Sequence, residues 1–444
     1  MSGMTQEAVS GVPAKATQET EARRRDWWWA EASIWTDRMM SALGDGVKGG
    51  KWFSVVDKVI RPTTLEAAWR KVERNKGSCG IDGQSVERFA AGAQKYLAEL
   101  QASLKSGGYE PAPVKRVEIP KAGGQTRPLG IPTVKDRIVQ TALKMAIEPI
   151  FEAAFRPGSY GFRPGRSCKD ALREVDRLVK AGFTHVVDAD LKSYFDAIPH
   201  DRLLAQVARK ISDGRVLKLI EGYLRQDVMK GMARWTPTTG TPQGAVISPL
   251  LANVYLHPLD LLMEESGYKM ARYADDFVIL CRSAEEAAAA LRQVEAWTAA
   301  NGLTLHPDKT RIGDCLQPGE GFEFLGYRFE AGRRFVRKKS LKAFKAKLRA
   351  KTRRSGGLGL AKTIAGLNPV LRGWFGYFQS AAPSTFRALD GFIRRRLRAM
   401  LRKQEKRPGF GRCLADQRRW PNAYFADRGL LTLTAAYENA RHPR

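Results

Sequence analysis

The chain has 444 residues, a hydrophobic content of 43% and a formal net charge of +29 at pH 7. It is long enough for two or three domains with apolar cores, and no apolar run approaches the ~18 residues that a membrane-spanning helix needs. The charge is uneven, because residues 331–444 hold 29 Lys and Arg against 5 Asp and Glu, whereas residues 1–330 hold 46 against 41. This basic C-terminal third predicts a polyanionic partner, and a merely solvated basic face is the weaker alternative.

The five cysteines are scattered, at positions 79, 168, 281, 315 and 413. They form no CxxC pair, so neither a zinc site nor a disulfide framework is indicated, and we expect a cytosolic protein in a reducing compartment. The first 22 residues mix acids, Gly and Pro, which predicts a disordered tail rather than a signal peptide. Five tryptophans follow between Arg23 and Trp52. We expect most of them to pack in a core and some to contact a partner.

Residues 65–74 have the apolar spacing of an amphipathic helix, and a glycine-rich loop over 77–83 follows it. The loop suits a close approach to a nucleic-acid backbone, or it is a long turn. Residues 115–132 predict a β-hairpin with Lys121 and Arg127 near its tip. Two cations there suit a triphosphate, although isolated charges are more often simply exposed to solvent.

A long apolar helix is predicted over residues 136–155, and the segment 157–167 after it interleaves glycines, aromatic rings and arginines. This composition suits contacts with the sugars and phosphates of a nucleic-acid strand. It makes Arg163 and Arg166 candidate nucleic-acid ligands.

An acidic strand is predicted at residues 185–196. Asp188 and Asp190 are two apart and therefore share one face of it. Carboxylates beside buried apolar residues are costly unless a cation or hydrogen-bond donors compensate. Lys192 is one such compensation, and a bound metal ion is the other.

A second acidic pair, Asp275 and Asp276, lies at the tip of a hairpin predicted over residues 269–280. Asp is a common turn residue, but adjacent carboxylates also suit Mg²⁺. Together with Asp190 they provide three carboxylates from two strands, which fits a two-metal phosphoryl-transfer site.

Two further residues suit a nucleotide pocket. Phe195 lies five residues after Asp190, close enough for its ring to lie under a sugar and to clash with a 2′-hydroxyl. Gln243 lies in a Gly-Pro frame, where it faces a base or nucleotide, or belongs to a plain turn.

The C-terminal third is predicted to form basic amphipathic helices. One apolar stripe contains Leu341, Phe344 and Leu348; a second contains Phe386, Leu389, Ile393, Leu397 and Met400. The candidate nucleic-acid ligands on these helices are Lys342, Lys345, Arg349, Arg394, Arg395 and Arg398.

In their order along the chain, these motifs resemble those of the group II intron-encoded reverse transcriptases and maturases. The similar segments are residues 80–83, 127–132, 160–164, 190–196, 242–244, 273–276, 309, 324–327 and the maturase-like 367–378. The resemblance implies an α+β right-hand polymerase, with fingers and an antiparallel palm sheet, followed by an α-helical thumb or maturase domain. The expected boundaries are residues 1–50 for the tail and Trp-rich helix, 51–335 for fingers and palm, and 336–444 for the thumb.

The resemblance also implies site residues and partners. Two Mg²⁺ ions are expected at Asp190, Leu191, Asp275 and Asp276, and the nucleotide at Lys121, Arg127, Phe195, Gln243 and Lys309. The implied partners are intron RNA, target DNA, dNTPs and the duplex of RNA template and DNA primer. Such a protein assists splicing, copies the intron by target-primed reverse transcription, and is expected in the bacterial cytoplasm near the nucleoid. No His-Asn-His nuclease segment is recognised, which resembles the endonuclease-lacking bacterial class C lineage.

Three other functions are considered. A reverse transcriptase domesticated for defence or DNA repair shares the chemistry but not the RNA partner. A non-catalytic splicing cofactor has no use for three converging carboxylates. A viral RNA-dependent RNA polymerase is disfavoured by Tyr273-Ala274 in place of Gly before the Asp pair, and by Phe195.

Overall fold

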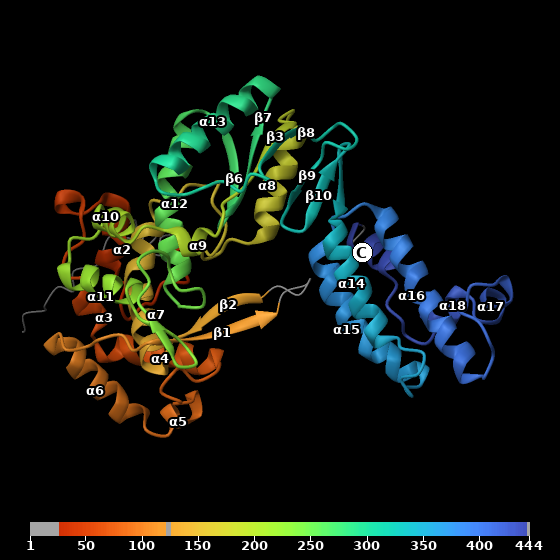
Figure 1. The fold of residues 1–444 in the computed structure, drawn as a ribbon, viewed down its shortest axis with the longest axis horizontal. Coiled ribbons are helices and arrows are strands. Elements are labelled where there is room, and N and C mark those ends of the chain that lie inside the picture. Colours follow the sequence, from red (N-terminus) through yellow and green to blue (C-terminus); the bar gives the residue numbers. More distant parts are fainter. Residues whose placement is uncertain (1–25, 121–125, 442–444) are drawn as a thin grey trace, which may run out of the picture. The chain divides into compact units, whose positions relative to one another are not determined.

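The protein is described here from a computed structural model, which covers residues 26–120 and 126–441 (Figure 1). These residues form two compact units, each assembled from separate stretches of the chain. Among the described residues, the first comprises residues 26–120 and 126–167, Asp190–Asp275 and Arg292–His306, and the second Cys168–Ala189, Asp276–Leu291 and residues 307–441. Because the units are discontinuous in sequence, the three consecutive domain ranges stay predictions. The predicted N-terminal tail lies outside the described residues.

Among the described residues up to Asp275, helices outnumber strands. The helices are α2 (Asp37–Asp45), η1 (Lys48–Gly50), α3 (Val56–Val59), α4 (Pro62–Asn75), α5 (Val86–Ala90), α6 (Ala93–Ser106), α7 (Val134–Glu152), α8 (Cys168–Lys180), α9 (Tyr194–Ala197), α10 (His200–Ala208), α11 (Gly214–Leu224) and α12 (Ser248–Glu265). The strands are β1 (Val114–Pro120), β2 (Thr126–Ile131), β3 (His185–Asp190), β4 (Val228–Lys230), β5 (Ala233–Trp235) and β6 (Lys269–Tyr273).

From Asp276 on, α13 follows β7, the strands β8 to β11 come next, and the remaining helices follow them. The strands are β7 (Asp276–Cys281), β8 (Arg311–Asp314), β9 (Phe322–Phe324), β10 (Tyr327–Glu330) and β11 (Arg333–Val336). The helices are α13 (Ala284–Ala300), α14 (Lys338–Lys351), α15 (Leu360–Phe378), α16 (Pro383–Gln404), α17 (Leu414–Arg419), α18 (Asn422–Ala426) and α19 (Leu433–Arg441).

Helix α7 forms the centre of the core of the first unit. Thr133 caps it, because its hydroxyl accepts a hydrogen bond from the Asp136 amide at 3.1 Å. Most side chains of α7 are buried, and α4 packs against it. The apolar residues of α4 recur with helical spacing and are buried, which confirms the helix predicted over residues 65–74.

The N-terminal tryptophans divide between core and surface. Trp35 is 4% exposed and its indole Nε1 donates to the Met145 carbonyl at 3.0 Å, whereas Trp28 is 72% exposed. Packing therefore accounts for Trp35.

Strands β1 and β2 form the predicted antiparallel hairpin, with Lys115 opposite Ile131 and Pro120 opposite Thr126 (Figure 1). β1 also pairs in parallel with β4, which gives a four-stranded sheet of order β2-β1-β4-β5. The hairpin tip, residues 121–125, lies outside the described residues, and Lys121 with it.

The two acidic motifs belong to a four-stranded sheet of order β6-β7-β3-β8, in which β3 pairs antiparallel with β8. β3 ends at Asp190, β6 ends at Tyr273, and β7 begins at Asp276. The hairpin predicted from the sequence is therefore confirmed. The acidic strand predicted over residues 185–196 is confirmed only as far as Asp190, because Tyr194–Ala197 form the short helix α9.

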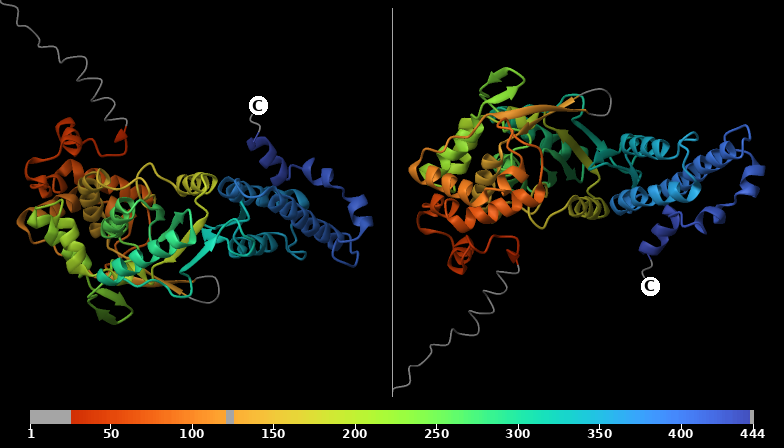
Figure 2. Two further views of the ribbon diagram at one scale, coloured as in Figure 1. Left: turned by 90° about the horizontal axis from the view of Figure 1, so that it is seen from above. Right: turned by 90° about the horizontal axis from the view of Figure 1, so that it is seen from below.

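The C-terminal part of the second unit is mostly helical, and α14, α15 and α16 lie side by side in all views (Figure 1, Figure 2). Phe344 and Leu348 on α14 are buried, and so is the whole predicted stripe of α16. Asp390 of α16 accepts hydrogen bonds from the Leu433 and Thr434 amides at 2.9 and 3.0 Å, and so caps α19. The predicted order, an α+β region followed by a helical one, is confirmed.

Within the described ranges, no helix combines the length and the apolar character required to cross a membrane.

Candidate active site

Backbone hydrogen bonds fix Asp190 at the end of β3. Its carbonyl accepts from the His306 amide at 2.7 Å, and the Lys192 amide donates to Thr304 at 2.9 Å. Between them Leu191, only 3% exposed, forms an antiparallel bridge with Leu305. This extra pairing holds the Asp190 backbone rigidly after the strand itself has ended.

The second acidic motif is a tight turn. Ala274 has φ 62°, which is left-handed and unusual for a residue with a Cβ. Asp275 follows it, is half-buried, and is joined directly to Asp276 at the start of β7. The turn lets the chain reverse between β6 and β7 with the acidic pair at its tip.

Burial raises the pKa of the Asp275 carboxyl, and the negative charge of Asp190 raises this pKa further. The positive charges of Arg127 and Arg272 oppose the shift. Asp190 and Asp275 are the first and last residues of one stretch of the first unit, and their charges are close enough to repel each other. Two such carboxylates are most stable in their charged form when a cation lies between them.

Among the residues that the structure describes, no group of three or more His, Cys, Asp or Glu side chains is arranged to hold a metal ion. Mg²⁺ in nucleotidyl-transfer sites commonly uses only one or two carboxylates, with waters and substrate phosphates as its other ligands. The oxygen donors of Asp190 and Asp275, and their mutual repulsion, fit an ion of this kind.

Asp188 has a different role from Asp190. Its carboxylate pairs with the Arg311 guanidinium at 3.2 Å and accepts from the Glu323 amide at 3.5 Å. Burial raises the pKa of Asp188 and Arg311 opposes the shift. The Arg311 guanidinium therefore compensates the charge of this carboxylate.

Of the predicted nucleotide residues that the structure describes, three lie in the first unit, and two of these are in direct contact. The Arg127 Nε donates to Gln243 Oε1 at 2.8 Å, and the Gln243 amide nitrogen lies 3.3 Å from Asp196 Oδ2. Gln243 and Asp196 also line a cavity of about 240 Å³. Lys309 is exposed and belongs to the second unit, so its role at the nucleotide stays a prediction.

The third predicted nucleotide residue, Phe195, belongs to a group of aromatic rings. Its ring centroid is 6.4 Å from that of Phe162, which in turn is 6.4 Å from Tyr273. Phe162 is 46% exposed and has φ 58°. Phe162 lies in the segment 157–167 that was predicted to contact nucleic acid, but its place beside Phe195 and the acidic turn was not predicted.

Two of the arginines predicted to bind nucleic acid are structural. Arg163 is 6% exposed, pairs with Glu152 at 2.6 Å, and donates to the Arg156 and Ser159 carbonyls at 2.6 Å each. Arg398 is 7% exposed, and its guanidinium donates to the Trp420 carbonyl at 2.9 Å. Because these guanidinium groups are buried and already hydrogen-bonded, neither prediction is kept.

The other candidates remain available at the surface to different degrees. Arg166 is half-buried and donates to the Pro157 carbonyl at 2.8 Å. The half-buried ring of Phe392 has three cations near it: Lys345, Arg349 and Arg395 lie 5.8, 5.4 and 5.5 Å from its centroid. We call these four residues the Phe392 cluster. Lys342 is exposed and Arg394 half-buried.

The sequence matches two family models. Residues 119–329 match the model for reverse transcriptase (RNA-dependent DNA polymerase), and residues 341–420 match the group II intron maturase-specific domain.

Two curated relatives are similar to this chain. Protein YkfC of Escherichia coli K12 is 37% identical over 313 residues, which are 61% of this chain and 81% of YkfC. The group II intron-encoded protein LtrA of Lactococcus lactis subsp. cremoris is 36% identical over 217 residues, which are 48% of this chain but only 36% of LtrA. Among solved structures, a chain of a partial Cas6-RT-Cas1–Cas2 complex is similar over 55% of this chain and 41% of its own, with 28% identity and a TM-score of 0.36. A score this low carries no weight.

Proposed function

We propose that this chain, which belongs to the group II intron reverse transcriptase and maturase family, copies RNA into DNA and promotes the splicing of an intron RNA. The chain has a reverse transcriptase domain, which makes it an RNA-directed DNA polymerase by family.

The observation that carries the proposal is the sheet order β6-β7-β3-β8, in which β3, ending at Asp190, neighbours β7, which begins at Asp276 directly after the acidic turn. The influence of the Asp190 charge on the pKa of Asp275 agrees with this arrangement. Asp190, Leu191, Asp275 and the adjoining Asp276 would hold two Mg²⁺ ions. When bound, these ions make a primer 3′-hydroxyl more acidic and stabilise charge on the phosphoryl oxygens.

The neighbouring side chains suit a deoxynucleotide. The Arg127 guanidinium, oriented by Gln243, would bind phosphate oxygens. The ring of Phe195 would lie under the sugar, where a 2′-hydroxyl has no room, with Phe162 beside it. Lys121 and Lys309 are included in the proposed nucleotide site because of the resemblance to the family.

The fold supports a right-hand polymerase with a thumb that binds nucleic acid. In this proposal residues 51–335 form fingers and palm, and residues 336–444 form the thumb. The exposed or half-buried cations Arg166, Lys342, Lys345, Arg349, Arg394 and Arg395 would contact phosphates of intron RNA or of the duplex between RNA template and DNA primer. Use of a target DNA strand as primer belongs to the same proposal.

Primer extension on an RNA template with dNTPs and Mg²⁺ tests the catalytic assignment. We expect Asp275→Asn to abolish extension while its affinity for the template–primer duplex stays at the wild-type value. Asp188→Asn is the matched control, because Asp188 is a nearby acid that pairs with Arg311. We expect this control to extend primers. Wild-type protein that binds the duplex but does not extend it would refute the proposal, and so would an active Asp275→Asn.

A maturase function is favoured by the match of residues 341–420 to the maturase-specific domain. It is tested by splicing of the RNA that flanks the reading frame, at a Mg²⁺ concentration where that RNA alone is inactive. We expect the wild type and Asp275→Asn to promote splicing equally, since RNA binding needs no polymerase chemistry. No effect of either protein would exclude splicing of that RNA and favour a domesticated reverse transcriptase.

A further inference from the structure

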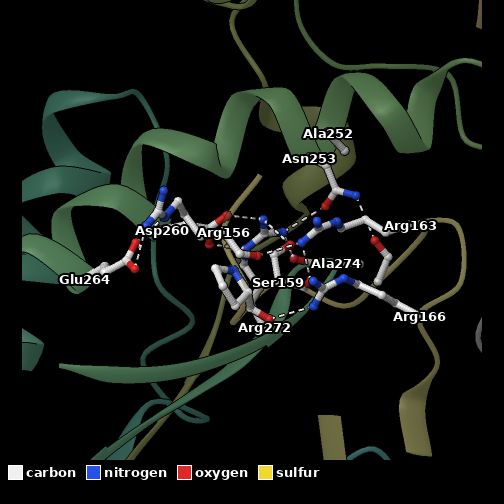
Figure 3. Close-up of polar contacts among 12 residues, drawn as sticks. Arg156, Ser159, Arg163, Arg166, Ala252, Asn253, Asp260, Glu264, Arg272 and Ala274 are labelled. Carbon is white, nitrogen blue, oxygen red and sulfur yellow. Dashed lines mark hydrogen bonds and ion pairs between the residues drawn. The ribbon is translucent and has the colours of Figure 1, made fainter. Parts of the chain in front are cut away.

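Arg272, the residue before Tyr273-Ala274-Asp275, is completely buried. Its guanidinium forms a two-pronged ion pair with Asp260, with Nε at 2.7 Å from Oδ1 and Nη2 at 2.5 Å from Oδ2. Nη1 donates to Asn253 Oδ1 at 2.9 Å, and Nη2 donates to Ser159 Oγ at 2.8 Å. Figure 3 shows Asn253 and Asp260 pointing from α12 toward this guanidinium.

The fifth hydrogen bond of Arg272 reaches the acidic turn itself. Nη1 donates to the Ala274 carbonyl at 2.9 Å (Figure 3). An arginine has five N–H donors in a fixed plane, and here all five are used. Only two of them are needed for the ion pair with Asp260, so the other three hold neighbouring groups in place.

The Ala274 carbonyl needs such a restraint. A left-handed conformation at a residue with a Cβ costs about 1–2 kcal/mol and persists only where the surroundings enforce it. Ala274 has φ 62° and its carbonyl carbon is bonded to the Asp275 nitrogen. Movement of this peptide therefore moves the Asp275 carboxylate.

Asn253 connects the same network to a second piece of backbone. While its oxygen accepts from Arg272, its nitrogen donates to the Gly161 carbonyl at 2.7 Å. The backbone of Gly161 lies against the turn, because a Cβ there would lie 2.8 Å from the Tyr273 carbonyl carbon. The turn is thus both packed on Gly161 and hydrogen-bonded to Arg272.

We infer that Arg272 is a positioning residue for nucleotidyl transfer: its guanidinium, anchored by Asp260, Asn253 and Ser159, holds the Ala274 carbonyl and so fixes the Asp275 carboxylate beside Asp190. This inference rests on the proposed function, because it assigns Arg272 to the same catalytic centre. Arg272 is buried and touches neither nucleic acid nor nucleotide.

The experiment separates positioning from stability with two variants. Arg272→Lys keeps a positive charge for Asp260 but has three rotatable donors in place of the planar fork. The double variant Asp260→Leu with Arg272→Met removes both charges together, a replacement that is often neutral for stability. Arg163→Lys is the control, since Arg163 is an ion-paired arginine of the same unit that is 6% exposed and donates its hydrogen bonds to Glu152 and to the Arg156 and Ser159 carbonyls, not to Ala274.

Three quantities are measured for each protein: urea stability, kcat and KM for dNTP in primer extension, and Mn²⁺ binding to the complex of protein and template–primer duplex, read from the electron paramagnetic resonance of free Mn²⁺. For both Arg272 variants we expect kcat to fall on the order of 100-fold, with KM for dNTP nearly unchanged and weaker Mn²⁺ binding. Arg163→Lys is expected to lose stability with wild-type Mn²⁺ binding.

Several results would overturn the inference. One is a folded double variant with wild-type kcat and Mn²⁺ binding; another is an Arg163→Lys protein with the same loss of Mn²⁺ binding. If neither Arg272 variant folds, Ser159→Ala removes a single hydroxyl of the network, and unchanged kcat and Mn²⁺ binding in that variant would refute the inference too. Failure of the wild type to extend primers is a distinct outcome, which refutes the proposed function.

Discussion

The Nε of Arg127 donates to the side-chain oxygen of Gln243 at 2.8 Å, across 116 positions of the sequence. Arg127 lies in strand β2, and Gln243 lies in the loop before α12. The backbone is tied at the same place, because the Gly130 amide donates to the Gln243 carbonyl at 2.6 Å. An exposed arginine is thereby held in one orientation before any nucleotide binds.

Gln243→Ala is expected to raise KM for dNTP up to about tenfold, with a smaller change in kcat. Without its partner, Arg127 must be ordered during binding, which costs about 0.5–1.5 kcal/mol. Steady-state extension with varied dNTP measures this. Gln101→Ala, which removes a hydrogen bond to the Ile60 carbonyl elsewhere in the same unit, is the control. An unchanged KM in Gln243→Ala would show that the contact does not prepare the site.

Gly161→Ala is expected to destabilise the first unit by about 1–3 kcal/mol and to lower kcat strongly. The added methyl group would lie 2.8 Å from the Tyr273 carbonyl carbon and closer still to the Ala274 nitrogen, so the acidic turn must shift. Urea unfolding and primer extension measure the two effects. Gly214→Ala is the control, since a Cβ there meets nothing within 4 Å. Equal behaviour of the two variants would contradict the close packing of Gly161 on the turn.

The pH dependence of stability is expected to reflect the titration of the Asp136 carboxylate. This carboxylate is 1% exposed and accepts from Tyr109 at 2.5 Å and Thr133 at 2.7 Å. Burial nevertheless raises the pKa of Asp136 above its ordinary value of 3.8. The folded protein then binds the proton more tightly than the unfolded chain, so the free energy of unfolding falls as pH rises from about 3.8 through the folded pKa.

Asp136→Asn removes that titration, and we expect its stability relative to wild type to improve over the same pH range. Tyr109→Phe removes a hydrogen bond that lowers the pKa of Asp136. The free energy of unfolding of this variant should therefore keep falling to a higher pH than that of the wild type. Urea unfolding at a series of pH values measures all three proteins. Parallel stability profiles for wild type and Asp136→Asn would show that Asp136 is not the group responsible.

Local patterns made much of the fold predictable. The hairpin around Asp275 and the strand ending at Asp190 follow from short alternating runs that end in acidic corners. The buried stripes of α14 and α16 follow from helical spacing of large apolar residues. Each of these signals lies within about twenty residues of chain, and each is decided by local periodicity.

Long-range partners were not predictable in the same way. Arg163 and Arg398 lie in arginine-rich segments typical of nucleic-acid contact, yet Glu152 and the Trp420 carbonyl hold them in the interior. Composition does not show which of several arginines finds a buried partner. Arg272 was missed for the same reason, although one signal existed: Asn253 and Asp260 are seven residues apart, on one face of the mostly apolar α12.

The Phe392 cluster is expected to contribute to the salt dependence of RNA affinity. Lys345, Arg349 and Arg395 surround one ring, and on nearby Arg396 the charges of Arg349 and Arg395 act with burial to lower the guanidinium pKa. A phosphate is expected to bind strongly to cations that repel one another in this way. Its negative charge relieves the repulsion, and binding releases counterions from the RNA.

Replacing Lys345, Arg349 and Arg395 by Ala is therefore expected to reduce the slope of log affinity against log salt by about one for each RNA phosphate that the variant no longer neutralises. Phe392→Ala is expected to leave that slope unchanged and, where a base stacks on the ring, to cost about 1–3 kcal/mol of affinity at every salt concentration. Filter binding of RNA across a salt series measures both. Arg70→Ala is the control, because Arg70 is an exposed cation already paired with Glu66 in the other unit. A triple variant with the wild-type slope would remove the Phe392 cluster from the RNA-binding surface, and the charge of the C-terminal third would then need another explanation.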